Sequence, residues 1–212
     1  MKLKHKHLLN LLQANDFKVQ NLDLKIPRNL FNKNKHFDLY QIYKELGGIQ
    51  EEFPHIEEEL YYIEPSTIIK LDDYIHFNRY RNITLRSILY EQIPSFPLEN
   101  YKRYCRNFEK ECIKSGLQQR IWANRESDYY FGPSSSPGDF FKNGSGGWKL
   151  LAFKDLLEDA AAYVLNYKVI RFSVFDNFLA EGKLVRLDNI LDTPTHPLQQ
   201  QLLKYIVRRI KE

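Results

Sequence analysis

The chain has 212 residues, of which 43% are hydrophobic and 27% are charged. This balance excludes an intrinsically disordered chain, because it supplies enough apolar surface for a substantial core. The net charge of +4 is unevenly distributed: residues 1–44 carry nine Lys or Arg against three acids, residues 45–99 four against eleven, and residues 100–212 eighteen against thirteen. An acidic middle segment therefore lies between basic flanks.

The apolar segments indicate neither a membrane span nor a secretory signal. No stretch approaches the roughly 18–20 continuous apolar residues that a bilayer requires, and the N-terminal segment turns polar at Asn10. Cys105 and Cys112 are too few for a disulfide framework and lack metal-ligand spacing. We therefore expect a cytoplasmic protein without a membrane partner, in which both cysteines have buried structural roles.

Residues 1–50 are interpreted as a helical N-terminal part. Apolar residues at helical spacing predict one helix over Leu3–Ala14 and a second over Phe37–Leu46, where Gly47 follows as a stop. The lysine-rich segment between them contains Pro27 and is read as an irregular connector.

The segment over residues 57–90 predicts a β-hairpin followed by a helix. Leu60–Ile63 and Thr67–Leu71 are β-branched and aromatic runs, and Glu64–Ser66 between them has the composition of a turn. The apolar residues from Tyr80 to Leu89 suit a helix better than a strand. Alternate residues of the second strand, Lys70 and Asp72, are expected on one face of the sheet.

Residues 91–149 are interpreted as an insertion. A helical stripe predicts one helix over Leu98–Ser115, ended by Gly116, and Lys102, Arg106 and Lys110 form a basic ridge on another of its faces. The stretch Trp122–Lys149 is rich in Gly and Ser and has no sustained period, which predicts a long loop.

The last part of the chain returns to regular structure. The pattern predicts a largely buried helix over Trp148–Asn166, a strand over Lys168–Val174, a short strand or loop at Leu184–Leu187, and a final amphipathic helix over Leu198–Ile210. A hairpin, helices and a later strand predict an α/β or α+β fold with a small mixed sheet. We expect one domain over residues 1–212, with residues 57–90 and 150–212 as its core.

The order of these motifs resembles the PD-(D/E)xK restriction-endonuclease-like superfamily, and within it the very-short-patch-repair-like branch. The resemblance covers residues 57–89 and 163–190. Its motifs are Glu59 as the first acid, Ile68–Asp72 as the returning strand, His76 in a short loop, Arg79 and Arg81 opening a helix, and Val169–Phe172 as the later strand.

The resemblance implies a metal-dependent nuclease, with a role in genome defence or repair. It implies Mg²⁺ held by Glu59, Asp72 and Asp73, where the metal would activate water for attack on a phosphate. The catalytic candidates are Glu59, Lys70, Asp72 and His76. The candidates for nucleic-acid contact are Arg79, Arg81, Lys102, Arg106 and Lys149.

One residue departs from the family pattern. Lys70 stands where the family places a metal-binding acid, and an ammonium group repels Mg²⁺ and adds no ligand. Two hypotheses from different classes therefore stay open: a nuclease-like protein that acts on or binds nucleic acid, with or without catalysis, and a non-enzymatic protein–protein interaction subunit of a larger assembly. A small-molecule hydrolase has no supporting nucleophile–His–acid constellation.

The long loop carries two further signals. Gly144–Gly147 precede a helix, where backbone N–H groups can approach a phosphate, although the spacing is not that of a Walker A motif. Aromatic residues alternate with cations in the same loop, a composition that suits either base stacking or anchoring of the loop against the core. The aromatic residues are Trp122, Tyr129, Tyr130, Phe131, Phe140, Phe141 and Trp148.

Overall fold

The computed structural model describes residues 3–25, 30–31, 36–63, 66–193 and 197–211, with the side chains of residues 21–25 and 57–62 outside this description. The fold is α+β, as predicted, and the first sheet is mixed. The strands are β1 (Val19–Lys25), β2 (Glu57–Ile63), β3 (Thr67–Asp72), β4 (Lys168–Ser173), β5 (Asn177–Ala180) and β6 (Lys183–Arg186). The helices are α1 (Leu3–Gln13), α2 (Phe37–Glu45), α3 (Arg79–Thr84), α4 (Leu98–Asn107), α5 (Glu109–Gln118), α6 (Arg125–Phe131), α7 (Gly146–Val164), α8 (Leu187–Leu191) and α9 (Gln199–Lys211), with 3₁₀ turns η1 (Tyr74–His76) and η2 (Ile88–Glu91).

The main sheet has the strand order β1-β2-β3-β4. The predicted hairpin is confirmed: β2 and β3 are antiparallel, with Tyr61 opposite Ile69. β4 lies parallel to β3, with Lys70 opposite Arg171 and Asp72 opposite Ser173. Parallel neighbours need a crossover connection, and here α3 to α7 form it, so the predicted insertion lies inside the crossover.

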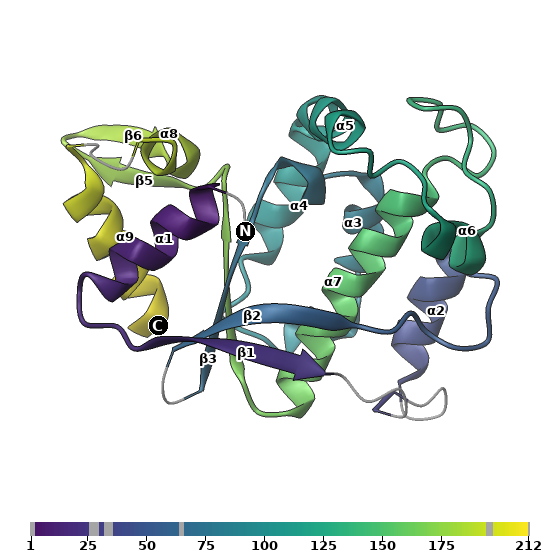
Figure 1. Ribbon diagram of the computed structural model, residues 1–212, viewed down its shortest axis with the longest axis horizontal. Helices are drawn as coiled ribbons and strands as arrows, with labels where there is room; N and C mark the ends of the chain where they lie inside the picture. The colour runs from purple at the N-terminus through teal and green to yellow at the C-terminus, as the bar shows by residue number, and fades with distance from the viewer. Residues whose placement is uncertain (1–2, 26–29, 32–35, 64–65, 194–196, 212) are drawn as a thin grey trace.

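The helices lie on both sides of the central strands. In Figure 1, β3 and β4 separate α1, α8 and α9 from α2 to α7. A single cluster of buried apolar side chains extends from α1 to α9. α7 leads directly into β4 and also packs against α3 and α6. Its central part is therefore buried, and any polar side chain on its sheet-facing side must find a partner inside the protein.

The N-terminal part is not all helical, because β1 lies within the segment read as a connector. β1 pairs antiparallel with β2, from Val19 opposite Ile63 to Lys25 opposite Glu57. β1 is a short edge strand with many polar residues, so its sequence gives only a weak indication of β-structure. Pairing with β2, more than its own composition, determines its conformation. Pro27 lies outside the described residues.

The predicted helix over Leu98–Ser115 is two helices. The chain leaves helical geometry at Phe108, with φ −116° and ψ 20°, and α5 then continues past Gly116 to Gln118. The Phe108 ring stacks on Phe175, with 3.9 Å between ring centroids. Cys105 and Cys112 are buried, as expected.

The stretch predicted as one long loop contains a helix. α6 begins after a capping box in which Asn124 accepts from the backbone N–H of Ser127 and the Ser127 hydroxyl accepts from the backbone N–H of Asn124. α7 begins at Gly146 with Ser145 as its N-cap, two residues before the expected start. Among the described helices, none combines the length and the apolar character that a bilayer span requires.

The sequence pattern also leaves the β5–β6 hairpin and α8 unassigned or open. The turn residues Glu181 and Gly182 both have positive φ, at 52° and 76°, which is the conformation of a two-residue hairpin turn that follows the twist of the strands. Of the segment Leu184–Leu187, all but the last residue belong to β6. α8 then begins at Leu187 and α9 closes the chain against it.

Candidate functional site

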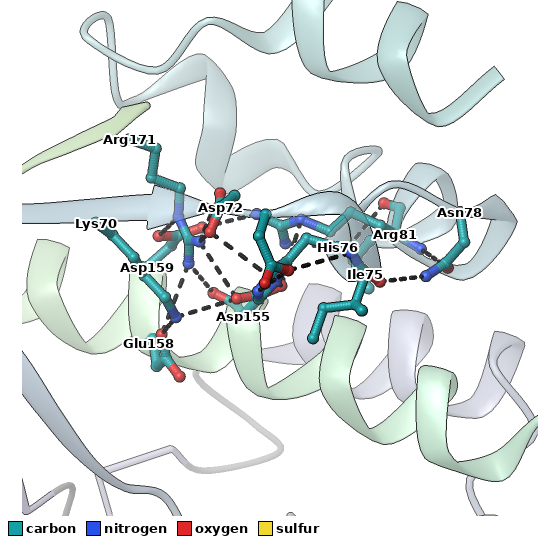
Figure 2. A network of polar contacts seen from close by, with 12 residues as sticks. Lys70, Asp72, Ile75, His76, Asn78, Arg81, Asp155, Glu158, Asp159 and Arg171 are labelled. Atoms are coloured by element: carbon teal, nitrogen blue, oxygen red, sulfur yellow. Dashed lines mark hydrogen bonds and ion pairs between the residues drawn. The ribbon is translucent and has the colours of Figure 1, made fainter. Parts of the chain in front are cut away.

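A network of charged side chains lies between the main sheet and α7. Alternate positions of β3 place Lys70 and Asp72 on one face, and the parallel register places Arg171 of β4 beside Lys70. The helical spacing i, i+3, i+4 places three acids of α7 on the opposing side. Figure 2 shows these side chains pointing toward one another. The α7 acids are Asp155, Glu158 and Asp159.

Arg171 is the centre of this network. Its side chain is fully buried, and Nη1 donates to both carboxylate oxygens of Asp72, at 2.7 and 2.9 Å. Nε donates to Asp159 at 2.8 Å, and Nη1 also reaches Asp155 at 3.2 Å. Burial lowers the pKa of the guanidinium, but the surrounding carboxylates outweigh it and hold that pKa well above its usual value.

Lys70 is the second cation of the network and lies beside Glu158. Its Nζ lies 3.1 Å from Asp155 Oδ1 and also pairs with the Glu158 carboxylate. Burial lowers the pKa of Lys70, and the attraction of Glu158 and Asp155 overcomes this effect and raises it above the usual value. Lys70 therefore stays protonated, and its ammonium group donates to two acids of α7.

Arg81 and His76 complete the network from the segment after β3. Nη2 of Arg81 donates to Asp159 at 3.2 Å, and the side chain is buried. His76 Nδ1 lies 2.8 Å from Asp155 Oδ2. The carboxylates of Asp72, Asp155, Glu158 and Asp159 face three permanent cations, and Asp73 lies 4.0 Å from His76 Nε2. A protonated His76 therefore adds a fourth positive charge to a cluster with an excess of acids.

Protonation of His76 is expected to stabilise the fold. Burial lowers the pKa of His76, but Asp155 and Asp72 outweigh this effect and raise the pKa above 6.5. The stabilisation is fully present below pH 6.5 and is lost as the pH rises through the folded-state pKa. Urea unfolding of the wild type between pH 6 and pH 9 should therefore show a falling free energy of unfolding, and His76→Gln should reduce this slope. An equal slope in both proteins would contradict the assignment.

A divalent metal does not fit this network. Asp72, His76 and Asp155 each offer one ligand atom, and these atoms lie within 4.8 Å of one another. However, Arg171 donates to both oxygens of Asp72, and Tyr101 donates to one of them at 2.8 Å. Arg171 also pairs with Asp155, and so does Lys70. Two permanent cations therefore already neutralise the two carboxylates that Mg²⁺ would need as ligands. The predicted magnesium site is not supported by these residues.

The structure brings three of the four predicted catalytic residues together. Lys70, Asp72 and His76 all contact Asp155 or Arg171. The fourth, Glu59, lies in β2 opposite Asp23, and its side chain lies outside the described residues. Asp73, a predicted metal ligand, instead begins η1, where its carboxylate accepts from the backbone N–H of Ile75 at 3.2 Å.

Two of the predicted nucleic-acid contacts, Arg81 and Lys149, have buried side chains. Arg81 faces Asp159 and the Tyr90 hydroxyl. Lys149 is buried at the start of α7, and its Nζ donates to Asn143 Oδ1 at 2.7 Å. Burial of a cation requires internal partners, so these residues stabilise the interior and are not available to a phosphate.

The remaining predicted contacts lie at the surface. Arg79 is half exposed and forms a two-point pair with Glu109, with distances of 2.9 and 2.8 Å. Lys102 pairs with Glu99 at 3.2 Å. Arg106 is exposed on α4 and has no ion pair with an acid of the described residues.

The glycine-rich segment before α7 is not a phosphate site. The backbone N–H of Gly146 donates to Ser134 Oγ at 2.8 Å, and that of Gly147 donates to the Trp122 carbonyl at 3.0 Å. The N–H of Trp148 donates to Ser145 Oγ. Since the first N–H groups of the helix are occupied inside the protein, an anion has no donor there.

The α7 acids were missed from the sequence, although they leave a signal. Asp155, Glu158 and Asp159 follow helical spacing within a segment that is otherwise apolar on two sides and was expected to be buried. Charged residues in a buried helix require partners of opposite charge. The strand patterns place the cations Lys70 and Arg171 on the sheet, and these are the natural partners for the acids of the buried helix.

Comparisons with known proteins give one match. A family model, the family of unknown function DUF7255, matches residues 41–193. This range holds the whole charged network. Neither the curated proteins nor the solved structures give a match.

Proposed function

Because this chain belongs to the family DUF7255, whose function is unknown, we propose a function from its own surface and interior: it binds nucleic acid through α4 and α5 and does not cleave it. The observation that carries this proposal is a set of exposed cations without acid partners on these two helices. The resemblance to restriction-endonuclease-like proteins stays a prediction that agrees with binding.

The interior supports the absence of cleavage. Asp72, which the family resemblance implies as a metal-binding acid, is held by Arg171, and the neighbouring Asp155 is held by both Arg171 and Lys70. Metal-assisted hydrolysis needs free carboxylate oxygens and an accessible water position, and Asp72 and Asp155 are fully buried. The network acts as a structural element of the core.

The surface of α4 and α5 supports contact with phosphates. Arg106, Lys110 and Lys114 are exposed, and none of them pairs with an acid in the part of the chain that the structure describes. Glu109 on the same surface is already paired with Arg79. Unpaired cations on neighbouring helices produce a local positive potential, which attracts the phosphate backbone without reading sequence.

Nucleic-acid binding is expected to depend on salt and on these cations. We expect the wild type to bind labelled oligonucleotides with an affinity that falls steeply between 50 and 200 mM salt. The double variant Arg106→Glu with Lys110→Glu should weaken binding and reduce the slope of log affinity against log salt by about 2. Plasmid, single-stranded DNA and RNA incubated with Mg²⁺ or Mn²⁺ should remain uncut.

The matched control changes the same net charge elsewhere. Lys183→Glu with Lys204→Glu replaces exposed lysines of β6 and α9, which lie at the left end of Figure 1, on the other side of β3 from α5. This variant should bind almost as the wild type does. Equal loss in both double variants would show that only net charge matters and would contradict the assigned surface. Metal-dependent cleavage that disappears in Asp72→Asn would contradict the absence of catalysis.

A second candidate function, protein binding, is favoured by an apolar groove. The groove has a volume of about 460 Å³ and lies between α2, η2 and the C-terminal end of α7. Phe37, Ile88 and Tyr163 line it and are 60%, 57% and 43% exposed. Asp38 also lines it, and the last turn of α7 contains no basic residue. These features suit a partner helix with an apolar face and a flanking cation.

A further inference from the structure

The loop between α6 and α7 is held in place by its own hydrogen bonds. Asn143 Nδ2 donates to the carbonyls of Phe131 and Pro133, at 2.9 and 2.8 Å. Trp122 Nε1 donates to the Ser135 carbonyl at 2.7 Å, and the buried Lys149 holds Asn143 from the other side. The loop therefore presents its side chains in a fixed arrangement before any partner binds, which lowers the entropic cost of binding.

The structure separates the aromatic residues of this region into anchors and exposed rings. Trp122, Phe131 and Trp148 are buried. Phe140 packs against both Trp122 and Trp148, with ring centroids 5.4 and 5.8 Å away. The next residue, Phe141, is 83% exposed, the highest value among the large apolar side chains that the structure describes.

Phe141 has a cation as its next residue, and its backbone N–H donates to the Asp139 carboxylate at 2.8 Å. Lys142 follows it in the left-handed region, with φ 56°, and is exposed. Lys142 has no ion pair with an acid of the described residues. A fully exposed ring beside an unpaired cation has the chemistry that stacks on a base and neutralises the adjacent phosphate. An apolar partner protein would not require the cation.

A chain of contacts joins Phe141 to the basic surface of α5. The Arg79 guanidinium lies 3.8 Å from the centroid of the Phe140 ring and pairs with Glu109, the first residue of α5. Lys110 follows Glu109 directly. In Figure 1 the loop after α6 and α5 lie on the same upper side of the molecule. A strand held by the α5 cations can therefore continue toward Phe141.

We propose that Phe141 stacks on an unpaired base of single-stranded nucleic acid whose phosphates are held by the cations of α5 and by Lys142. This inference rests on the proposed function and adds that the bound form is single-stranded, since the bases of an intact duplex are stacked on each other and their faces are not accessible to the ring. Base–aromatic stacking does not depend on the identity of the base.

The test compares single strands with a duplex. The probes are a labelled oligonucleotide of thymidines, an RNA of uridines and a blunt duplex of the same length. We expect Phe141→Ala to weaken binding of both single strands by at least about 5-fold and to leave weak duplex binding unchanged. Phe141→Trp should retain single-strand binding, and its added indole fluorescence should be quenched by the bound strand, because the native Trp122 and Trp148 are buried.

The outcomes separate this inference from the function it rests on. Because Phe141 is exposed, the alanine variant should keep the wild-type melting temperature, which checks that its fold is intact. If the wild type binds single strands and Phe141→Ala binds them equally well, stacking is overturned and phosphate binding stands. Equal loss on single strands and duplex also overturns stacking on an unpaired base. If the wild type binds none of the probes at 50 mM salt, both proposals are overturned.

Discussion

Replacing Arg171 with alanine is expected to lower the free energy of unfolding by at least about 3 kcal/mol. The side chain is fully buried and donates to Asp72, Asp155 and Asp159. Its removal leaves buried carboxylates without their main cation and creates a cavity as well. Urea unfolding followed by circular dichroism measures the difference at one pH.

Arg79→Ala is the matched control for this prediction. Arg79 also forms a two-point pair with a carboxylate, that of Glu109, but its side chain is 49% exposed. Solvent replaces the lost contacts, so the expected cost is below about 1 kcal/mol. Similar losses in the free energy of unfolding for the two variants would mean that the buried network contributes no more than a surface ion pair. That result would contradict its role as a structural part of the core.

Adding a methyl group at Gly147 is the second change with a large expected effect. A Cβ at this position would lie 1.6 Å from the Ile121 carbonyl oxygen, which belongs to the backbone and cannot rotate away. Gly147→Ala must therefore move the start of α7 away from Ile121 and break the hydrogen bond from the Gly147 N–H to Trp122. We expect a loss of roughly 3 kcal/mol or more in the free energy of unfolding.

Gly146→Ala provides the comparison within the same helical turn. There the nearest atom to an added Cβ is Ser134 Oγ at 3.1 Å, the end of a side chain that can shift. Its cost should be clearly smaller, as measured by thermal and urea unfolding of both variants. If both alanine variants are equally stable, close packing against the Ile121 backbone is not the reason why a glycine occupies position 147. The glycine would then need another reason, such as approach to a ligand.

Local patterns were sufficient for the elements that form the centre of the sheet. The hairpin over Leu60–Leu71 and the strand over Lys168–Val174 were predicted because their β-branched residues are bounded by turn residues. The pattern failed for β1 and for the break at Phe108. In both places a partner far along the chain, β2 or Phe175, determines the conformation.

The candidate site was predicted in part. Alternation along β3 placed Lys70 and Asp72 on one face, and His76 was expected near them, as the structure has it. The local pattern does not place the α7 acids and Arg171 beside these residues, because the contacts come from elements far along the chain. The sequence predicts Arg81 and Lys149 as nucleic-acid contacts, since nothing in their local sequence shows that each has a partner inside the protein.

The sequence by itself determined the α+β class, the hairpin and the facing of Lys70 and Asp72, because these depend on the two-residue and 3.6-residue periods of local backbone geometry. It also contained the uneven charge, with basic residues concentrated outside the acidic middle segment. Only the tertiary structure decided which charges meet. The crossover helix α7 brings Asp155, Glu158 and Asp159 onto Lys70 and Arg171, although Lys70 and Asp155 are 85 residues apart in sequence. Because these side chains are buried, they compensate one another's charge inside the protein.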